Sequence, residues 1–179
     1  NCAEICAKEM NFSREHQDEF AIESYNRSAK SWEEGRFSEE IVSVNVPQRG
    51  GDDIVISEDE EYRNVKMEKI PTLRPVFDKE GTITAANAST LNDGASALVL
   101  MSKEKADELN IKAIAKIISY ADAGQEPEWF TTTPAKALPI AIKKAALSTS
   151  EIDYFELNEA FSVVGLANMK LLNLDPSKV

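Results

Sequence analysis

The sequence contains 179 residues, of which 42% are hydrophobic and 28% are charged, a composition typical of a globular domain rather than of a disordered segment. The net charge of −11 argues against a nucleic-acid partner, because contact with a phosphate backbone requires a basic surface. No apolar run approaches the roughly 20 residues of a membrane-spanning helix, so we expect no membrane partner. Two cysteines, Cys2 and Cys6, and a single histidine argue against a disulfide and a zinc site, and they favour a reducing, intracellular compartment.

The N-terminal part of the sequence predicts two helices. Residues 3–10 predict a short helix, and residues 14–34 predict a long one with Ser13 as its N-cap and Gly35 after its end. One face of the long helix carries the apolar and small residues Phe20, Ala21, Tyr25, Ser28, Ala29 and Trp32. We expect the opposite face to be solvated, and it carries His16, Glu15, Asp18, Glu19, Glu23, Arg27, Lys30 and Glu33.

The middle of the sequence predicts a hairpin followed by irregular chain. Residues 41–47 alternate in polarity and predict a strand, and residues 54–56 predict its partner across a polar, glycine-rich turn. The acidic residues 57–61 predict an exposed loop. Residues 36–80 lack the alternation of strand and helix, so we interpret them as an excursion from a larger α/β fold.

The C-terminal half predicts alternating strands and helices. Strands are expected at residues 97–101, 111–120 and 154–157. The helices are expected to begin after Ser102, at Pro134 with Thr133 as N-cap, and near Phe161, and to end near Leu109, Leu147 and Leu172. This order predicts a doubly wound arrangement, and the fold class is therefore α/β.

Two stretches stand out as candidate ligand sites. Residues 85–94 are almost all small, which lets a backbone approach a ligand closely, although such a stretch also suits a tightly packed loop. Asn158 follows a predicted strand, at the end of the strand where ligands collect in open α/β folds. Its amide could hold a water or polarise a carbonyl, or it could cap the following helix.

The blocks TAANASTLNDGA (residues 84–95) and NEAF (residues 158–161) resemble the thiolase family, most closely its biosynthetic branch. The resemblance runs from Ala3 to Pro176. It implies part of the thiolase αβαβα sandwich with an inserted mixed loop subdomain. Residues 1–94 would carry the loop subdomain and its return to the N-terminal half. Residues 95–179 would complete that half and begin the C-terminal half.

The resemblance also implies an activity, the reversible condensation of two acetyl-CoA to acetoacetyl-CoA and CoA through a cysteine thioester. Thiolases use a nucleophilic cysteine, a histidine in a Gly-His-Pro segment and a second cysteine, and the sequence contains none of the three at a matching position. The first residue is not Met, and no leader is recognisable. We therefore expect an internal piece of a longer protein that is inactive alone.

Several site residues follow from the resemblance. Asn158 would fix the water that, with the histidine, forms the oxyanion hole. Ala160 and Phe161 would line the pantetheine end of the pocket, Phe130 would face the acyl group, and Ser89 would bind the pantetheine arm. A strip made of Asn64, Val65, Lys66 and Lys69 would hold the nucleotide end of CoA.

In one subgroup, the mitochondrial type, the position of Tyr25 coordinates potassium next to the bound CoA. There the carbonyl oxygens of Ala85, Ala86 and Ala88 complete much of the site, and hard oxygen ligands suit such an ion. Tyr25 otherwise packs on its helix face. No organic cofactor is expected beyond the substrate CoA.

Partners, compartment and alternatives follow in the same way. The complete protein is expected to form a homo-oligomer, a dimer or a tetramer, in the mitochondrial matrix or the cytosol. One alternative is a degradative 3-ketoacyl-CoA thiolase that acts on longer chains. Others are a non-catalytic fragment or isoform that binds CoA or full-length subunits, and a CoA-binding module without acyl transfer.

Overall fold

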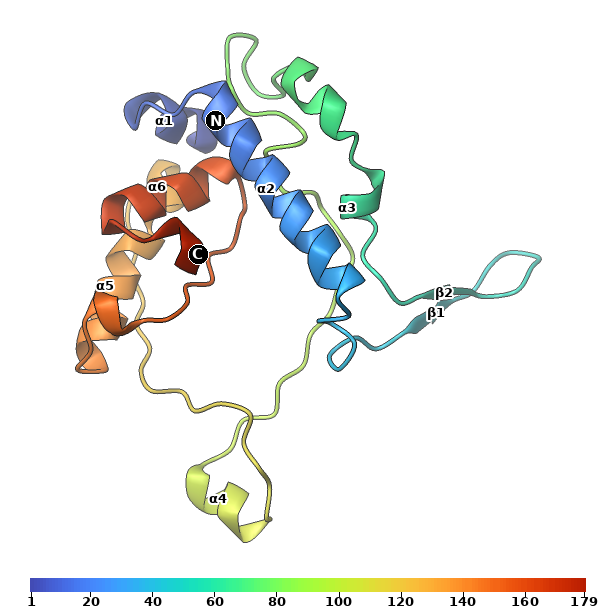
Figure 1. Ribbon diagram of the computed structural model, residues 1–179, viewed down its shortest axis with the longest axis vertical. Coiled ribbons are helices and arrows are strands. Elements are labelled where there is room, and N and C mark those ends of the chain that lie inside the picture. Colours follow the sequence, from blue (N-terminus) through green and yellow to red (C-terminus); the bar gives the residue numbers. More distant parts are fainter.

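The computed structural model describes residues 1–179, and its elements can be followed in Figure 1. The α-helices are α1 (Cys2–Glu9), α2 (Arg14–Glu33), α3 (Glu61–Asn64), α4 (Lys103–Glu108), α5 (Pro134–Lys144) and α6 (Ser162–Leu172). The strands are β1 (Val44–Val46) and β2 (Ile54–Ile56), and the 3-10 helices are η1 (Met67–Thr72), η2 (Pro127–Thr132), η3 (Thr149–Glu151) and η4 (Pro176–Lys178). Helices α1, α2, α5 and α6 lie together, while the β1–β2 hairpin and α4 extend away on long connections (Figure 1). No helix is both long and apolar enough to cross a membrane.

The core is small and built mostly from short side chains. Helices α1 and α6 and the chain between α3 and α4 contribute its buried residues, which are Ala3, Cys6, Ala7, Ile83, Val163 and Ala167. Small residues allow the two helices to approach closely. Helix α2 packs on α6 where the Phe20 ring lies against Gly165, and a Cβ at that glycine would come within 2.5 Å of Phe20 Cζ.

Most of the expected helix ends are confirmed. Ser13 caps α2 by accepting a hydrogen bond from the His16 amide at 3.2 Å, and Ser102 caps α4 in the same way. Gly35 follows α2 with a φ of +68°, the left-handed conformation that glycine adopts without strain. Pro134 begins α5 and Thr133 is its N-cap residue, as expected, but the Thr133 side chain makes no capping hydrogen bond. The Thr133 hydroxyl instead accepts a hydrogen bond from Gln125.

The predicted hairpin is confirmed and the other predicted strands are not. Strands β1 and β2 pair antiparallel, with Val44 opposite Ile56, and they form the only sheet in residues 1–179. Residues 97–101, 111–120 and 154–157 run as irregular chain. A strand requires a hydrogen-bonded neighbour, and no such neighbour lies beside these segments. Most of their apolar side chains are exposed, as at Leu98 and Ile114, although Phe155 is buried.

One expectation about charged residues is wrong. The helical pattern predicts Asp18 on the solvated face of the long helix, but Asp18 is only 5% exposed because Arg14 and Asn87 supply its hydrogen-bond partners. The expected exposed loop is confirmed over residues 57–60, and Glu61, also exposed, begins α3 and lines a cavity beside Tyr25. His16 is exposed, as expected.

Candidate functional site

The two sequence blocks that stand out meet in the structure. Ala88 forms an antiparallel bridge with Phe161, and the Ser89 amide donates a hydrogen bond to the Ala160 carbonyl at 3.1 Å. The Ser162 amide donates to the Asn87 carbonyl at 2.8 Å. The small-residue loop is therefore fastened along the turn that leads into α6, and Ser89 lies beside Ala160 and Phe161.

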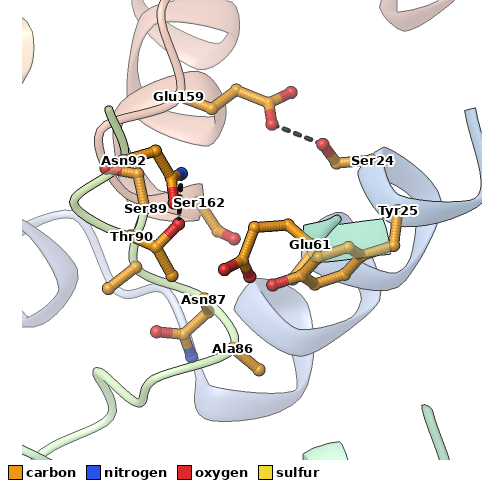
Figure 2. A pocket seen from close by; sticks show the side chains of 12 residues that line it. Ser24, Tyr25, Glu61, Ala86, Asn87, Ser89, Thr90, Asn92, Glu159 and Ser162 are labelled. Atoms are coloured by element: carbon orange, nitrogen blue, oxygen red, sulfur yellow. Dashed lines mark hydrogen bonds between the residues drawn. The ribbon is translucent and has the colours of Figure 1, made fainter. Parts of the chain in front are cut away.

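A first cavity, of about 240 Å³, lies between α2 and the small-residue loop. Its lining comprises Ala21, Ser24, Tyr25, Glu61, Ala86, Asn87, Ala88, Ser89, Thr90, Asn92, Glu159 and Ser162. Figure 2 shows the Tyr25 hydroxyl and the Glu61 carboxylate close together and facing the loop. Three of the four residues predicted to bind potassium, Tyr25, Ala86 and Ala88, line this cavity, whereas Ala85 is exposed and does not.

Tyr25 keeps its proton at neutral pH. Burial raises the pKa of Tyr25 above its usual value, and the negative charge of Glu61 raises it further. A neutral phenol presents both an O–H donor and oxygen lone pairs to the cavity. The first cavity can therefore offer the Tyr25 hydroxyl and the Glu61 carboxylate to a ligand.

A second cavity, of about 500 Å³, lies against α5. It is lined by Ala121, Phe130, Thr133, Pro134, Ala137, Leu138, Ala141, Glu156, Leu157 and Asn158. Asn158 and Phe130, to which the family resemblance gives roles at the reacting acyl group, share this cavity. Phe161 is close as well, with its ring centroid 6.5 Å from that of Phe130.

The capping role considered for Asn158 is wrong. Helix α6 begins at Ser162, and its N-cap is Phe161, which makes no side-chain capping bond. Asn158 therefore lies before the helix entry, with its side chain exposed at the apolar second cavity. An amide in this position can donate hydrogen bonds to a water or an oxyanion.

The strip predicted to bind the nucleotide of CoA lies elsewhere. Asn64 is the last residue of α3. Lys66 directly precedes η1, Lys69 lies within η1, and both lysines are exposed. Neither cavity includes any of these residues or Val65. Helix α2 holds the segment that directly follows the strip, because the Arg14 guanidinium donates hydrogen bonds to the carbonyls of Ile70 at 2.7 Å and Leu73 at 3.0 Å.

Three residues of this region are not assigned to a site by the sequence. Glu61 faces Tyr25 from a distant part of the chain, and no spacing rule connects the two. Glu159 accepts a hydrogen bond from the Ser24 hydroxyl at 2.5 Å, which ties the NEAF turn to α2 (Figure 2). Asn87 is 2% exposed. The sequence hints at its structural role only because it is a lone amide among alanines.

Two family models match nearly all of the chain. The family model "Thiolase, N-terminal domain" matches residues 1–104, and the model "Thiolase, C-terminal domain" matches residues 111–179. The mitochondrial acetyl-CoA acetyltransferase of Mus musculus is 53% identical over all of this chain and 42% of its own length. The acetyl-CoA acetyltransferase of Schizosaccharomyces pombe is 52% identical, over all of this chain and 46% of its own length.

Solved structures give the same result. The acetyl-CoA acetyltransferase of Bacillus anthracis superposes with a TM-score of 0.95 at 40% identity, over 99% of this chain and 45% of that one. The Acat5 thiolase of Ascaris suum, solved in complex with coenzyme A, superposes with a TM-score of 0.92 at 49% identity, also over 99% and 45%. The chain thus spans less than half the length of these relatives. The expected family and α/β fold class are confirmed: the chain belongs to the thiolase family.

Proposed function

We propose that this chain is part of an acetyl-CoA C-acetyltransferase, which converts two acetyl-CoA to acetoacetyl-CoA and CoA and also runs in reverse. The observation that carries the proposal is the placement of the Asn158 amide at an apolar cavity shared with Phe130. The relatives named above, acetyl-CoA acetyltransferases at 52–53% identity, support the choice of substrate class.

The reaction proceeds by two acyl transfers. A cysteine thiolate attacks the carbonyl of the first acetyl-CoA, the bond from that carbonyl carbon to the CoA sulfur breaks, and CoA leaves with a proton. A second acetyl-CoA then loses a proton from its methyl carbon, and the resulting enolate carbon attacks the enzyme thioester. The new carbon–carbon bond forms as the cysteine thiolate leaves. Negative charge develops on a thioester oxygen in each step.

Asn158 stabilises that oxygen through an ordered water. Donors fixed in advance at such an oxygen each lower the barrier by roughly 3–4 kcal/mol. The two cysteines of this chain do not supply the nucleophile. Cys6 is buried in the core and burial raises its pKa, and Cys2 lies on α1 and lines neither cavity. The nucleophile and the acid/base groups come from other parts of the complete protein.

Two surfaces of this chain bind CoA. Ser89 hydrogen-bonds the pantetheine arm, beside Ala160 and Phe161, and the Phe130 ring faces the acyl group. The exposed ammonium groups of Lys66 and Lys69, with Asn64 and Val65, hold the phosphates and the nucleotide. The complete protein works as a homo-oligomer.

The first cavity fits a potassium ion. Its neutral Tyr25 hydroxyl and the backbone at Ala86 and Ala88 present hard oxygen donors, and the Glu61 carboxylate adds a negative charge. Ala85 belongs to the same loop. When bound, the ion would supply positive charge beside the loop that carries Ser89.

The substrate profile of the complete enzyme tests the proposal. Thiolysis of acetoacetyl-CoA and of 3-ketoacyl-CoA substrates with longer chains is measured. The loss of the 3-ketoacyl absorbance reports the rate. The proposal predicts turnover that is highest for acetoacetyl-CoA. Preference for long chains would replace it with a degradative thiolase, and CoA binding without turnover would replace it with a non-catalytic binding module.

A further inference from the structure

The buried side chain of Asn87 anchors the small-residue loop to distant parts of the chain. Between Ala85 and Ala88 the only side chain that can form hydrogen bonds is that of Asn87. Its Oδ1 accepts from the Thr84 amide at 2.8 Å, and its Nδ2 donates to Thr82 O and to Asp18 Oδ1, both at 3.0 Å. Both amide donors are therefore used, and one further side-chain hydrogen bond at these positions is local, from the Ala86 amide to the Thr84 hydroxyl at 3.3 Å.

Asp18 connects this anchor to the strip that carries Lys69. Its second oxygen, Oδ2, accepts from Arg14 Nε at 2.6 Å, and Arg14 in turn holds the carbonyls of Ile70 and Leu73 at the end of η1. Asp18 and Asn87 are 5% and 2% exposed and the Arg14 side chain is 19% exposed, so the contact between Asp18 and Asn87 is shielded from water. We call Arg14, Asp18 and Asn87 the buried relay.

We propose that the buried relay is a positioning device for CoA, in which Asn87 and Asp18 set the loop at Ser89 relative to the Lys66–Lys69 strip. The inference rests on the proposed function. Each end of the relay adjoins one of the two surfaces assigned to CoA: Asn87 lies two residues before Ser89, and Ile70 directly follows Lys69. A ligand that must reach both surfaces requires a fixed spacing between them, and only α2 connects the two through these side chains.

The relay has a polarity that can be inverted. Asn87 donates and Asp18 accepts across the 3.0 Å contact. In N87D two carboxylates face each other in a buried place, where like charges repel strongly. In the double variant D18N/N87D, the new amide at position 18 donates to the new carboxylate at position 87 across the same contact, and its oxygen still accepts from Arg14. The inversion removes the hydrogen bond to Thr82 O.

The experiment uses the complete enzyme and measures kcat and KM for acetoacetyl-CoA, the dissociation constant of CoA, and thermal unfolding. N87D is expected to raise KM and the CoA dissociation constant about tenfold or more, the usual effect of losing a hydrogen bond to a charged group. D18N/N87D is expected to recover most of that loss. If N87D does not fold, D18N, which keeps the side-chain shape, is compared with the double variant instead.

A double-mutant cycle with S89A separates positioning from stability. If the relay acts through Ser89, the increases in KM caused by N87D and S89A will be clearly less than multiplicative. C6A serves as the matched control, because it removes a buried core atom on α1 and should lower the melting temperature without raising KM. N87D with lowered melting temperature and unchanged KM, or effects of N87D and S89A that multiply, would overturn the inference.

Failure of the proposed function gives a different pattern. If the wild-type enzyme binds CoA but transfers no acyl group, the proposed function is wrong, and the CoA dissociation constants of N87D and D18N/N87D still decide on the relay. If the wild-type enzyme neither binds CoA nor transfers an acyl group, both are wrong.

Discussion

Asn158 and Glu159 are consecutive residues that line different cavities. The Glu159 carboxylate accepts a 2.5 Å hydrogen bond from Ser24 on α2, and the Asn158 amide faces the apolar space next to Phe130. The hydrogen bond from α2 therefore fixes the turn from which the Asn158 side chain projects. The cavity lined by Tyr25 and the cavity lined by Phe130 therefore share this turn, which contributes one residue to each.

Removal of the Ser24 hydroxyl should affect turnover more than folding. In S24A the free energy of unfolding should fall by about 1 kcal/mol or less, because the pair is exposed, while kcat of the complete enzyme should fall severalfold as the Asn158 turn loosens. E23A is the control, because Glu23 forms only an exposed pair with Arg27 on the same helix. Equal kcat values for S24A and E23A would argue against a role for this contact.

Tyr25 should make stability fall at alkaline pH. Because burial and Glu61 raise the pKa of Tyr25 in the folded state, its contribution is fully present below the unfolded pKa near 10 and is lost as the pH rises through the folded pKa. The free energy of unfolding, measured in urea between pH 9 and pH 11, should therefore fall more steeply for the wild type than for Y25F. Parallel curves for the two proteins would contradict this account.

Replacement of Gly165 by alanine should destabilise the protein, although alanine favours helices. A Cβ at Gly165 would lie 2.5 Å from Phe20 Cζ, and two further ring atoms would lie within 3.2 Å. Overpacking of this kind costs about 1–3 kcal/mol, which exceeds the gain in helix propensity of about 1 kcal/mol. G165A should thus lower the free energy of unfolding, and F20L/G165A should recover part of the loss. A more stable G165A would show that the Phe20 ring moves aside freely.

Lys66 and Lys69 should act on the phosphates of CoA and on nothing else. K66A/K69A should raise KM for acetoacetyl-CoA severalfold at low salt, with a smaller difference at high salt, because the exposed charges are screened. A truncated thioester substrate without the nucleotide should show no difference. K103A/K105A, which removes two exposed lysines of α4, is the matched control. An equal effect of the two double variants would point to net charge rather than to a binding strip.

Local signals predicted the helices well. The capping serines Ser13 and Ser102 and the glycine at position 35 mark helix ends that depend only on neighbouring residues. The β1–β2 hairpin could be predicted for the same reason, since its two strands are joined by a short turn. The small-residue loop and the NEAF turn are recognisable as blocks in the sequence, and in the structure they meet through the bridge between Ala88 and Phe161.

Long-range partners could not be predicted from the sequence. Asp18 occupies a polar helix position in the sequence, and its burial depends on Asn87, which is far away along the chain. Glu61 lies in an acidic run and meets Tyr25 only after folding. The apolar segments 97–101, 111–120 and 154–157 have strand composition, but a strand forms only beside another strand, and the chain places none next to them.

The measurement that tests the central claim most directly is the turnover of N158A in the complete enzyme with acetoacetyl-CoA as substrate. Removal of the side chain that orders the oxyanion-stabilising water predicts that kcat falls by about a hundredfold or more while CoA binding changes little. N26A, at an exposed asparagine of α2, provides the control and should keep full activity. A kcat for N158A close to that of N26A would contradict the role assigned to Asn158 and, with it, the account of the second cavity as the site of acyl transfer.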